Sequence, residues 1–423
     1  MFSKKTLDNG LRIITVPKPD SPSATAMVLV GVGSRHEDPK LAGISHFIEH
    51  NVFKGTKKRP RRNQIPEEIE GLGGVTNAST SFDYTYYWAK AAASQVSKIL
   101  DIVMDISLNM IFPEKDLEIE RGNVIEEINM YQDNPPARLL QDFLEFVWGG
   151  QPVGRRIIGT KETVSSITRE QMLEFVRQNY LPSQMVVVAA GDVDAEAISS
   201  QVEAFYQEIS DEGKKKAGAK PFVEFQKEPR VYLDTDKTEQ THICLGVKSF
   251  DRYDQRRYAL DLLNTILGQG MSSRLFKKIR EELGLAYYVS SSNWEFLDTG
   301  LWFARAGVDT KRAEKAIKTI LAEFVRLAEE QVGDQELRKA KEYVKGRTLL
   351  SVETSDALGG WFGFRELFEE EVISPEEYNR RIEAITADEI RSVAADLFRN
   401  DRLNLGVVGP FRDKRKFEKI LKI

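Results

Sequence analysis

Residues 41–56 have the sequence LAGISHFIEHNVFKGT, which places His46, Glu49 and His50 within one short segment. On a helix, side chains four positions apart lie on the same face, so both imidazoles can reach one metal ion while Glu49 stays beside them. A catalytic zinc needs three protein ligands and an open position for water, and a carboxylate that is not a ligand can accept the proton of that water. The H-x-x-E-H pattern therefore predicts two zinc ligands and a general base. The competing interpretation is an ordinary amphipathic helix with two polar histidines.

A third ligand is expected on a long helix that begins near residue 113. Apolar residues and two glutamates, Glu120 and Glu127, recur there at steps of three and four, which is typical of one buried helix face. Burying an unpaired carboxylate costs several kcal/mol, and a metal ion is one partner that removes this cost. Glu126 lies about 100° around the helix from Glu127, so the helical phase favours Glu127 as the inward residue. The alternative, in which both glutamates are solvated, stays open because other isoleucines lie off this face.

Length and charge limit the class of protein. A chain of 423 residues with 41% hydrophobic content divides most naturally into two domains. Its 60 basic and 65 acidic residues give a formal net charge of -5, and no basic stripe outweighs its acidic neighbours. A nucleic-acid partner is therefore not expected.

The cellular compartment is inferred from the cysteine content and from hydropathy. Cys244 is the single cysteine, which excludes an intramolecular disulfide and a thiolate-rich metal site, and its apolar neighbours predict that it is buried. No segment is apolar enough for a signal-peptide core or a membrane span, so no membrane association is expected. A cytoplasmic location fits best, with a removed presequence as the open alternative.

The order of the predicted elements places the motif on a helix that follows a strand. A strand is expected at 22–33 and the motif helix at 44–53, with His36 exposed in the polar connection between them. Further helices are expected at 63–72, 94–109, 136–148 and 168–180, and further strands at 83–91 and 185–190. The paired glycines at 73–74 precede a small-residue segment and allow close approach by another backbone.

The second half of the chain repeats the first. The segment ICLGVKSF (243–250) corresponds to VLVGVGSR (28–35), and DTGLWFARA (298–306) corresponds to DYTYYWAKA (83–91) at the same offset. Two copies of one α+β unit are therefore predicted, with a metal-binding domain at 1–212, a linker at 213–221 and a second domain at 222–423. Asp261, Asn264 and Thr265 occupy the motif positions of the second copy, so only the first copy is expected to bind metal.

Three motifs follow one another along the chain: His46-x-x-Glu49-His50, then Gly73-Gly74 with Asn77-Ala78, then Glu120-Arg-Gly-Asn-Val-Ile-Glu-Glu127. With this set the chain resembles the pitrilysin/insulysin family of zinc metallopeptidases, and most of all its short two-domain subgroup, which includes the mitochondrial processing peptidase subunits and their bacterial relatives. The resemblance spans nearly the whole chain. It implies one Zn2+ per chain, held by His46, His50 and Glu127, with Glu49 as general base and Glu120 as an outer carboxylate that supports the site.

The resemblance also implies a fold and an assembly. The expected fold is α+β, with two homologous domains that each contain a mixed, mostly antiparallel sheet packed with helices, together forming one half of a clamshell. The family's Arg and Tyr pair, which contacts the substrate backbone, corresponds to Arg280 and Tyr287, with Tyr288 as the neighbouring alternative. Because this chain carries both the metal motif and this pair, a homodimer with sites completed across subunits is expected. A heterodimer with an inactive partner stays open.

The expected function is that of a zinc-dependent endopeptidase that hydrolyses unfolded peptides or presequence-like segments in an enclosed chamber. An extended peptide would add as a strand to the edge at residues 74–80, with Asn77 and Ala78 among its contacts. Two alternatives are a non-catalytic peptide-binding or structural subunit of the same fold and a zinc hydrolase that acts on another bond.

Overall fold

The protein divides into two compact units in a computed structural model that describes residues 2–211, 218–368 and 371–423. Unit 1 contains Met1–Ile128, Arg155–Lys220 and Leu349–Ser374, and unit 2 contains Asn129–Gly154, Pro221–Thr348 and Pro375–Ile423. The predicted boundaries at residues 212 and 222 treat each domain as one continuous stretch, whereas each unit takes one segment from the other half of the chain. Residues 213–217 of the predicted linker lie outside the described residues.

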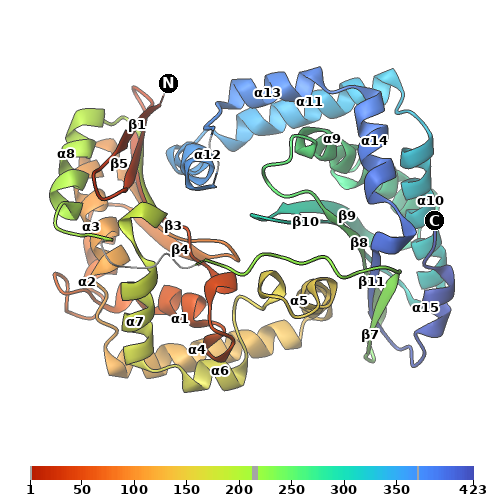
Figure 1. The fold of residues 1–423 in the computed structure, drawn as a ribbon, viewed down its shortest axis with the longest axis horizontal. Coiled ribbons are helices and arrows are strands. Elements are labelled where there is room, and N and C mark those ends of the chain that lie inside the picture. The colour runs from red at the N-terminus through yellow and green to blue at the C-terminus, as the bar shows by residue number, and fades with distance from the viewer. Residues whose placement is uncertain (1, 212–217, 369–370) are drawn as a thin grey trace. The chain divides into compact units, whose positions relative to one another are not determined.

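Unit 1 is built on a six-stranded sheet with the strand order β1-β2-β6-β3-β5-β4 (Figure 1). Neighbouring strands are antiparallel except β2 and β6, which are parallel. Strand β3 lies inside the sheet because its small and branched apolar residues are suited to burial on both faces. The strands are Ser3–Thr6 (β1), Arg12–Pro17 (β2), Ser23–Val30 (β3), Val75–Thr80 (β4), Thr85–Ala92 (β5) and Met185–Gly191 (β6).

Helices cover both faces of this sheet. Helix α3 packs on β3 and β5, helix α12 packs on β2, β3 and β6, and Figure 1 shows the two helices on opposite sides of the sheet. The helices of unit 1 are Ile44–Asn51 (α1), Gln64–Gly71 (α2), Val96–Leu108 (α3), Lys161–Ser166 (α6), Arg169–Asn179 (α7), Ala195–Tyr206 (α8) and Ser355–Phe368 (α12), and Glu114–Gln132 (α4) continues into unit 2. The predicted helices and strands of this half are confirmed to within a few residues.

Unit 2 repeats this plan with a five-stranded sheet in the order β7-β11-β8-β10-β9, in which only β7 and β11 are parallel. The strands are Arg230–Thr235 (β7), Gln240–Ser249 (β8), Ala286–Glu295 (β9), Gly300–Asp309 (β10) and Leu403–Gly409 (β11). Its helices are Pro135–Trp148 (α5), Arg257–Gly268 (α9), Ala313–Glu329 (α10), Asp334–Ser351 (α11), Pro375–Ala384 (α13), Ala387–Leu397 (α14) and Arg415–Ile420 (α15), together with the π-helix Phe276–Glu282 (η7). Helix α11 ends in unit 1. The predicted α+β fold with two mixed, mostly antiparallel sheets is confirmed.

Each sheet is covered in part by a helix from the other half of the chain. Helix α5 packs on β7, β8 and β11 in unit 2, and α12 packs in unit 1. Glycine permits the close approach of α12, because a Cβ on Gly363 would lie 2.6 Å from Leu29 Cδ1 and 2.7 Å from Val188 Cγ2. The exchange explains why the units are discontinuous in sequence.

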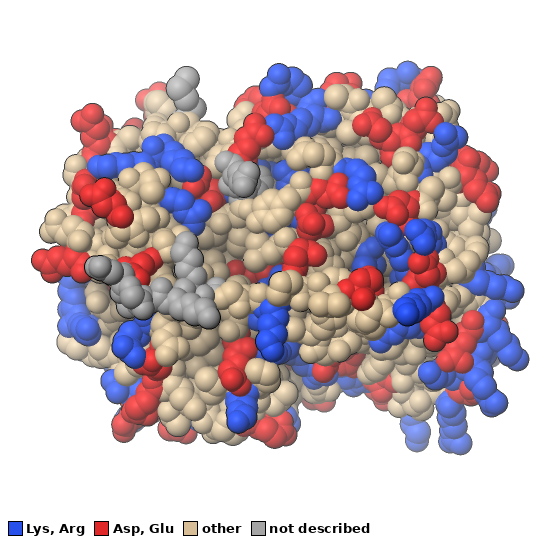
Figure 2. Space-filling model, viewed as in Figure 1, with Lys and Arg blue, Asp and Glu red and all other residues tan. Residues whose placement is uncertain are grey.

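Charged side chains of both signs are interspersed on the face of the molecule that Figure 2 displays. Among the described residues, no helix combines the length and the apolar character that a bilayer-spanning segment requires.

Candidate metal centre

The motif residues lie on the short helix α1, whose sequence separates an apolar face from a polar one. Ile44, Phe47 and Ile48 are buried in the core of unit 1. Of the motif residues, His46 is largely buried, and Glu49 and His50 are half-buried. The helical spacing predicted from the sequence therefore places both imidazoles on the side of α1 that faces Glu127 of α4.

Helix α4 brings a carboxylate to the two imidazoles. The Oε2 of Glu127 lies 3.3 Å from His50 Nε2 and 3.7 Å from His46 Nε2, and the three donor atoms all lie within 4.8 Å of one another. Glu126 is exposed to solvent, in agreement with the helical phase that favoured Glu127. The structure therefore brings together the three residues predicted as ligands.

The spacing and the chemistry of these donors fit a zinc ion. Ligands about 2.0–2.1 Å from a tetrahedral zinc are separated from one another by roughly 3.3 Å, which is close to the 3.3 and 3.7 Å between Glu127 Oε2 and the two imidazole nitrogens. Two imidazole nitrogens and one carboxylate oxygen are also a ligand set that catalytic zinc uses. Burial, with the neighbouring His50 second, lowers the pKa of His46 to about 4, so this ring is in the neutral form that metal binding requires. A single ion held by His46, His50 and Glu127 is compatible with all these features.

Glu120 lies behind His50, about two helical turns before Glu127. Its Oε2 is 3.4 Å from His50 Nδ1 and accepts a hydrogen bond from Asn123 at 3.1 Å, and its Oε1 pairs with Lys54 at 2.7 Å. Burial works to raise the pKa of Glu120, but the hydrogen bonds from Lys54 and Asn123 hold it below its ordinary value. Glu120 therefore stays ionised and can orient the ring of His50.

Glu49 interacts electrostatically with His50 and Glu127 and hydrogen-bonds to Thr80 at the end of β4. Burial raises the pKa of this carboxyl group, against the Thr80 hydrogen bonds and the charge of His50, which lower it. Thr80 Oγ1 also lies 3.3 Å from the carbonyl oxygen of Ser45 in α1. Thr80 thus connects the motif helix to the edge strand.

The predicted substrate-contact residues Asn77 and Ala78 lie on β4, the last strand of the sheet among the described residues. Only its β5 side is paired within this sheet. The Asn77 side chain is exposed and accepts a hydrogen bond from the backbone N–H of Ala78 at 2.9 Å, whereas the Ala78 side chain is buried. Their role in substrate binding stays a prediction.

Arg280 and Tyr287 lie close together in unit 2. The Arg280 guanidinium carbon is 6.0 Å from the ring centroid of Tyr287, whose side chain is 75% exposed. Tyr288, the alternative, is half-buried and its hydroxyl lies 3.1 Å from His242 Nδ1. Exposure therefore favours Tyr287 as the tyrosine able to meet a ligand, and its role stays a prediction.

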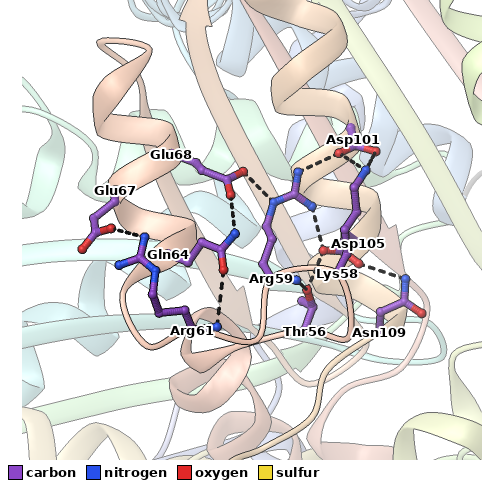
Figure 3. Close-up of polar contacts among 10 residues, drawn as sticks. All are labelled: Thr56, Lys58, Arg59, Arg61, Gln64, Glu67, Glu68, Asp101, Asp105 and Asn109. Atoms are coloured by element: carbon purple, nitrogen blue, oxygen red, sulfur yellow. Dashed lines mark hydrogen bonds and ion pairs between the residues drawn. The ribbon is translucent and has the colours of Figure 1, made fainter.

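A network of charged residues anchors the segment that follows α1 (Figure 3). The Arg59 side chain is buried and donates 2.7 Å hydrogen bonds to Glu68 of α2 and to Asp101 and Asp105 of α3. Thr56 Oγ1 donates to the same Asp105 at 2.6 Å. These bonds fix the loop between the motif helix and α2 to the core of unit 1.

Sequence reasoning missed three residues that contact the site residues or the motif helix. Lys54 follows His50 by four positions, which was the available signal that it lies beside the histidine. Thr80 ends the strand that was already singled out for peptide binding. Glu37 precedes the motif helix and lies within hydrogen-bond reach of its first turn, but an acidic residue in a polar loop ordinarily suggests exposure. His36, which was expected to be exposed, is half-buried, and its Nδ1 accepts the N–H of Gly33 at 3.2 Å.

Comparison with known proteins identifies the family. A model described as insulinase (peptidase family M16) matches residues 12–161, which contain the whole donor cluster, and a model described as the peptidase M16 inactive domain matches residues 166–344. This chain belongs to peptidase family M16. The predicted resemblance to the pitrilysin/insulysin family is therefore confirmed.

M16 relatives align with this chain over nearly its full length. A Streptomyces coelicolor protein named an uncharacterized zinc protease is 37% identical over 97% of this chain and 90% of its own length. A Bacillus subtilis protein with the same description is 33% identical over 95% of this chain and 97% of its own. The crystal structure of a protease from Helicobacter pylori, 24% identical, superposes with a TM-score of 0.90 over 97% of this chain and 99% of that one. At this identity the last comparison supports the M16 fold alone.

Proposed function

We propose that this chain is a zinc-dependent endopeptidase that hydrolyses unfolded peptides or presequence-like segments. The observation that carries the proposal is the cluster of His46, His50 and Glu127, with the carboxylate of Glu49 beside it, in a family whose relatives are named zinc proteases. We further propose one zinc ion per chain and a location in the cytoplasm, where a single buried cysteine is compatible with reducing conditions.

The side chains divide the chemistry between them. A zinc ion held by His46, His50 and Glu127 would supply Lewis-acid activation of a water molecule and of the scissile carbonyl group. Glu49 accepts the proton of the attacking water and then delivers it to the leaving amine. Glu120 keeps the ring of His50 in the orientation that binding requires.

Strand β4 is the proposed site for the peptide. On its other side β4 pairs with no further strand among the described residues, so an extended peptide can form backbone hydrogen bonds there, which do not depend on its sequence. Asn77 and Ala78 lie within the strand that the peptide would join. Thr80 ends this strand and contacts both Glu49 and α1, so a peptide on β4 extends towards the general base. A folded protein pairs most of its backbone groups internally, so unfolded segments are the favoured substrates.

The description of one matching model as an inactive domain does not weigh against this proposal. That model covers residues 166–344, whereas the three donors and Glu49 lie between residues 46 and 127, inside the insulinase match. A non-catalytic peptide-binding subunit remains the alternative that an experiment must separate from the enzyme.

The test combines metal analysis with a quenched-fluorescent peptide mixture. We expect the purified chain to contain zinc and to cleave peptides in a manner that a chelator abolishes. Glu49→Gln should retain zinc and lose cleavage, because an amide cannot accept the proton of water. Zinc without cleavage would favour a hydrolase for another bond, absence of zinc would favour the binding subunit, and undiminished turnover by Glu49→Gln would remove Glu49 from the mechanism.

We also propose a homodimer in which Arg280 and Tyr287 of one chain complete the metal site of the other. Mixing a Glu49→Gln chain with an Arg280→Ala chain should then restore about one working site per mixed dimer, since one site receives both intact residues. If both sets act within one chain, every site keeps a defect and activity stays absent. Measuring cleavage before and after mixing distinguishes the two arrangements, with each variant alone as the control.

A further inference from the structure

The segment Ser34–Glu37 joins β3 to the motif helix, and its first half is bound to the turn between β4 and β5. The backbone N–H groups of Ser34 and Arg35 donate to the carbonyl oxygens of Ser81 and Phe82 at 3.0 and 3.1 Å. Arg35 Nη1 also lies 3.0 Å from Asp83 Oδ1, and these two side chains are only 1% and 2% exposed. A buried, hydrogen-bonded ion pair in this position fixes the hairpin turn to the segment.

The second half of the segment is bound to the motif helix. Glu37 is buried, and its two carboxylate oxygens accept the backbone N–H groups of Gly43 at 2.8 Å and Ser45 at 2.9 Å. These are unpaired donors of the first turn of α1, where a negative charge is also favoured by the helix dipole. Arg155 Nη1 donates to the backbone carbonyl of Glu37 at 2.6 Å and adds a further contact to this residue.

Two residues separated by one residue, His36, therefore bind the two parts of the proposed site. Arg35 binds the hairpin whose outer strand is β4, and Glu37 binds the helix that carries His46, Glu49 and His50. The contact between Thr80 and Ser45 lies on the same boundary between α1 and β4. A displacement of one part relative to the other by about 1 Å would misplace the peptide carbonyl relative to Glu49 and can cost roughly a hundredfold in rate.

We propose that Arg35 and Glu37 are positioning residues that set the placement of the metal-binding helix α1 relative to the peptide-binding hairpin β4–β5. Neither residue touches the reacting atoms; each acts through the backbone it holds. This inference rests on the proposed function. It assigns separable tasks, because Glu37 holds the metal ligands whereas Arg35 holds the peptide strand.

The test compares Glu37→Gln with Arg35→Lys. In Glu37→Gln the NH2 group of the amide faces a backbone N–H group that donated a hydrogen bond to the carboxylate, so one of the two hydrogen bonds to α1 is lost. The zinc affinity should therefore fall about tenfold. The kcat for peptide cleavage should also fall, while KM stays unchanged. Arg35→Lys keeps the charge but loses the guanidinium geometry, so KM for peptide should rise about tenfold while zinc affinity stays unchanged. Zinc affinity is read by competition with a chromophoric chelator in the absence of peptide.

Arg12→Lys is the matched control, because Arg12 also pairs with a buried carboxylate of unit 1, Glu366, but lies on β2, which pairs with β1 and β6 and not with β4. It should lose stability without changing zinc affinity or KM. Glu37→Asp keeps the charge but reaches only one of the two backbone N–H groups, so its zinc affinity should be intermediate. This variant provides a second measurement if Glu37→Gln does not fold.

If Glu37→Gln and Arg35→Lys change KM and zinc affinity no more than Arg12→Lys, the two residues are only structural and the proposal is wrong. A wild-type chain that binds zinc but cleaves nothing would overturn the proposed function, whereas the zinc affinity of the Glu37 variants would still decide the role of that residue.

Discussion

Lys54 Nζ lies 2.7 Å from Glu120 Oε1, which places a cation behind the carboxylate that faces His50. The contacts form a chain from Lys54 through Glu120 to His50 and then to Glu127. A carboxylate behind a metal-binding imidazole fixes the ring and raises its basicity. The lysine supports this arrangement because its hydrogen bond helps to keep Glu120 ionised in a half-buried position.

Lys54→Met should therefore weaken zinc binding by about tenfold, within the range typical of changes behind a metal ligand. The substitution keeps most of the length of the side chain and removes the charge that orients Glu120. Zinc affinity is measured by competition with a chelator at constant pH. Lys58→Met is the control, since Lys58 lies in the same loop and pairs with Asp101 rather than Glu120 (Figure 3). Equal effects of the two substitutions would show that the loop as a whole, and not the Glu120 contact, matters.

His36 and Glu37 should give the stability of the protein opposing pH dependences. Burial, with the charge of Arg35 second, lowers the pKa of His36 from 6.5 to about 4, so its contribution is present above pH 6.5 and is lost as the pH falls to about 4. Burial raises the pKa of Glu37 from 4.5 to about 7 against its backbone hydrogen bonds, so its contribution is present below pH 4.5 and is lost as the pH rises to about 7. Over this interval the two effects offset each other.

Replacing either His36 or Glu37 should reveal the effect of the other residue on the pH dependence of stability. On acidification from pH 7 to pH 5, His36→Gln should gain free energy of unfolding relative to wild type, and Glu37→Gln should lose it, each by about 1–3 kcal/mol. Urea unfolding midpoints at the two pH values measure the difference. Parallel profiles for wild type and both variants would contradict the assigned shifts.

Zinc should stabilise the folded protein through unit 1. At free zinc one hundred times the dissociation constant, binding contributes about 2.7 kcal/mol, because the unfolded chain does not hold the three donors together. The thermal midpoint should therefore rise with zinc and return to its starting value with a chelator. His46→Ala should abolish the shift, and a shift that persists in this variant would place the bound metal elsewhere.

Local features of the site could be predicted because helical spacing and strand patterns are local properties. The ranges expected for α1 and β3 are confirmed to within three residues. The phase argument selected Glu127 rather than Glu126 because one residue on a helix turns the side chain by about 100°. The repeat in the sequence likewise predicted two related sheets.

Other features depend on contacts between distant segments, which one sequence does not display. The sequences of α5 and α12 do not predict which of the two similar sheets each helix covers. Glu37 and Lys54 were missed because charged residues in loops are mostly solvated, and their burial follows from where α1 and α4 lie in the fold. Glycines at steps of four in α12 were a signal of close packing, but they do not identify the partner.

Cys244 should resist alkylation in the folded protein. The thiol is buried inside β8, and burial raises its pKa well above the ordinary value, so the reactive thiolate is scarce. Thiol-reactive reagents should therefore label it only when unit 2 opens, and the labelling rate in increasing urea measures that opening. Rapid labelling under native conditions would show that the central strand of this sheet is accessible.

Helix α12 should tolerate a methyl group at one glycine and not at its neighbour. A Cβ on Gly363 would lie within 2.7 Å of Leu29 and Val188 side chains, whereas a Cβ on Gly360 meets only Phe364, at an ordinary 3.6 Å. Gly363→Ala should cost about 1–3 kcal/mol through overpacking against β3 and β6. Gly360→Ala should be neutral or stabilise by up to about 1 kcal/mol, since alanine favours the helix. Urea unfolding of the two variants measures both values, and because both substitutions add the same methyl group to the same helix, similar stabilities would show that α12 can move away from the sheet without cost.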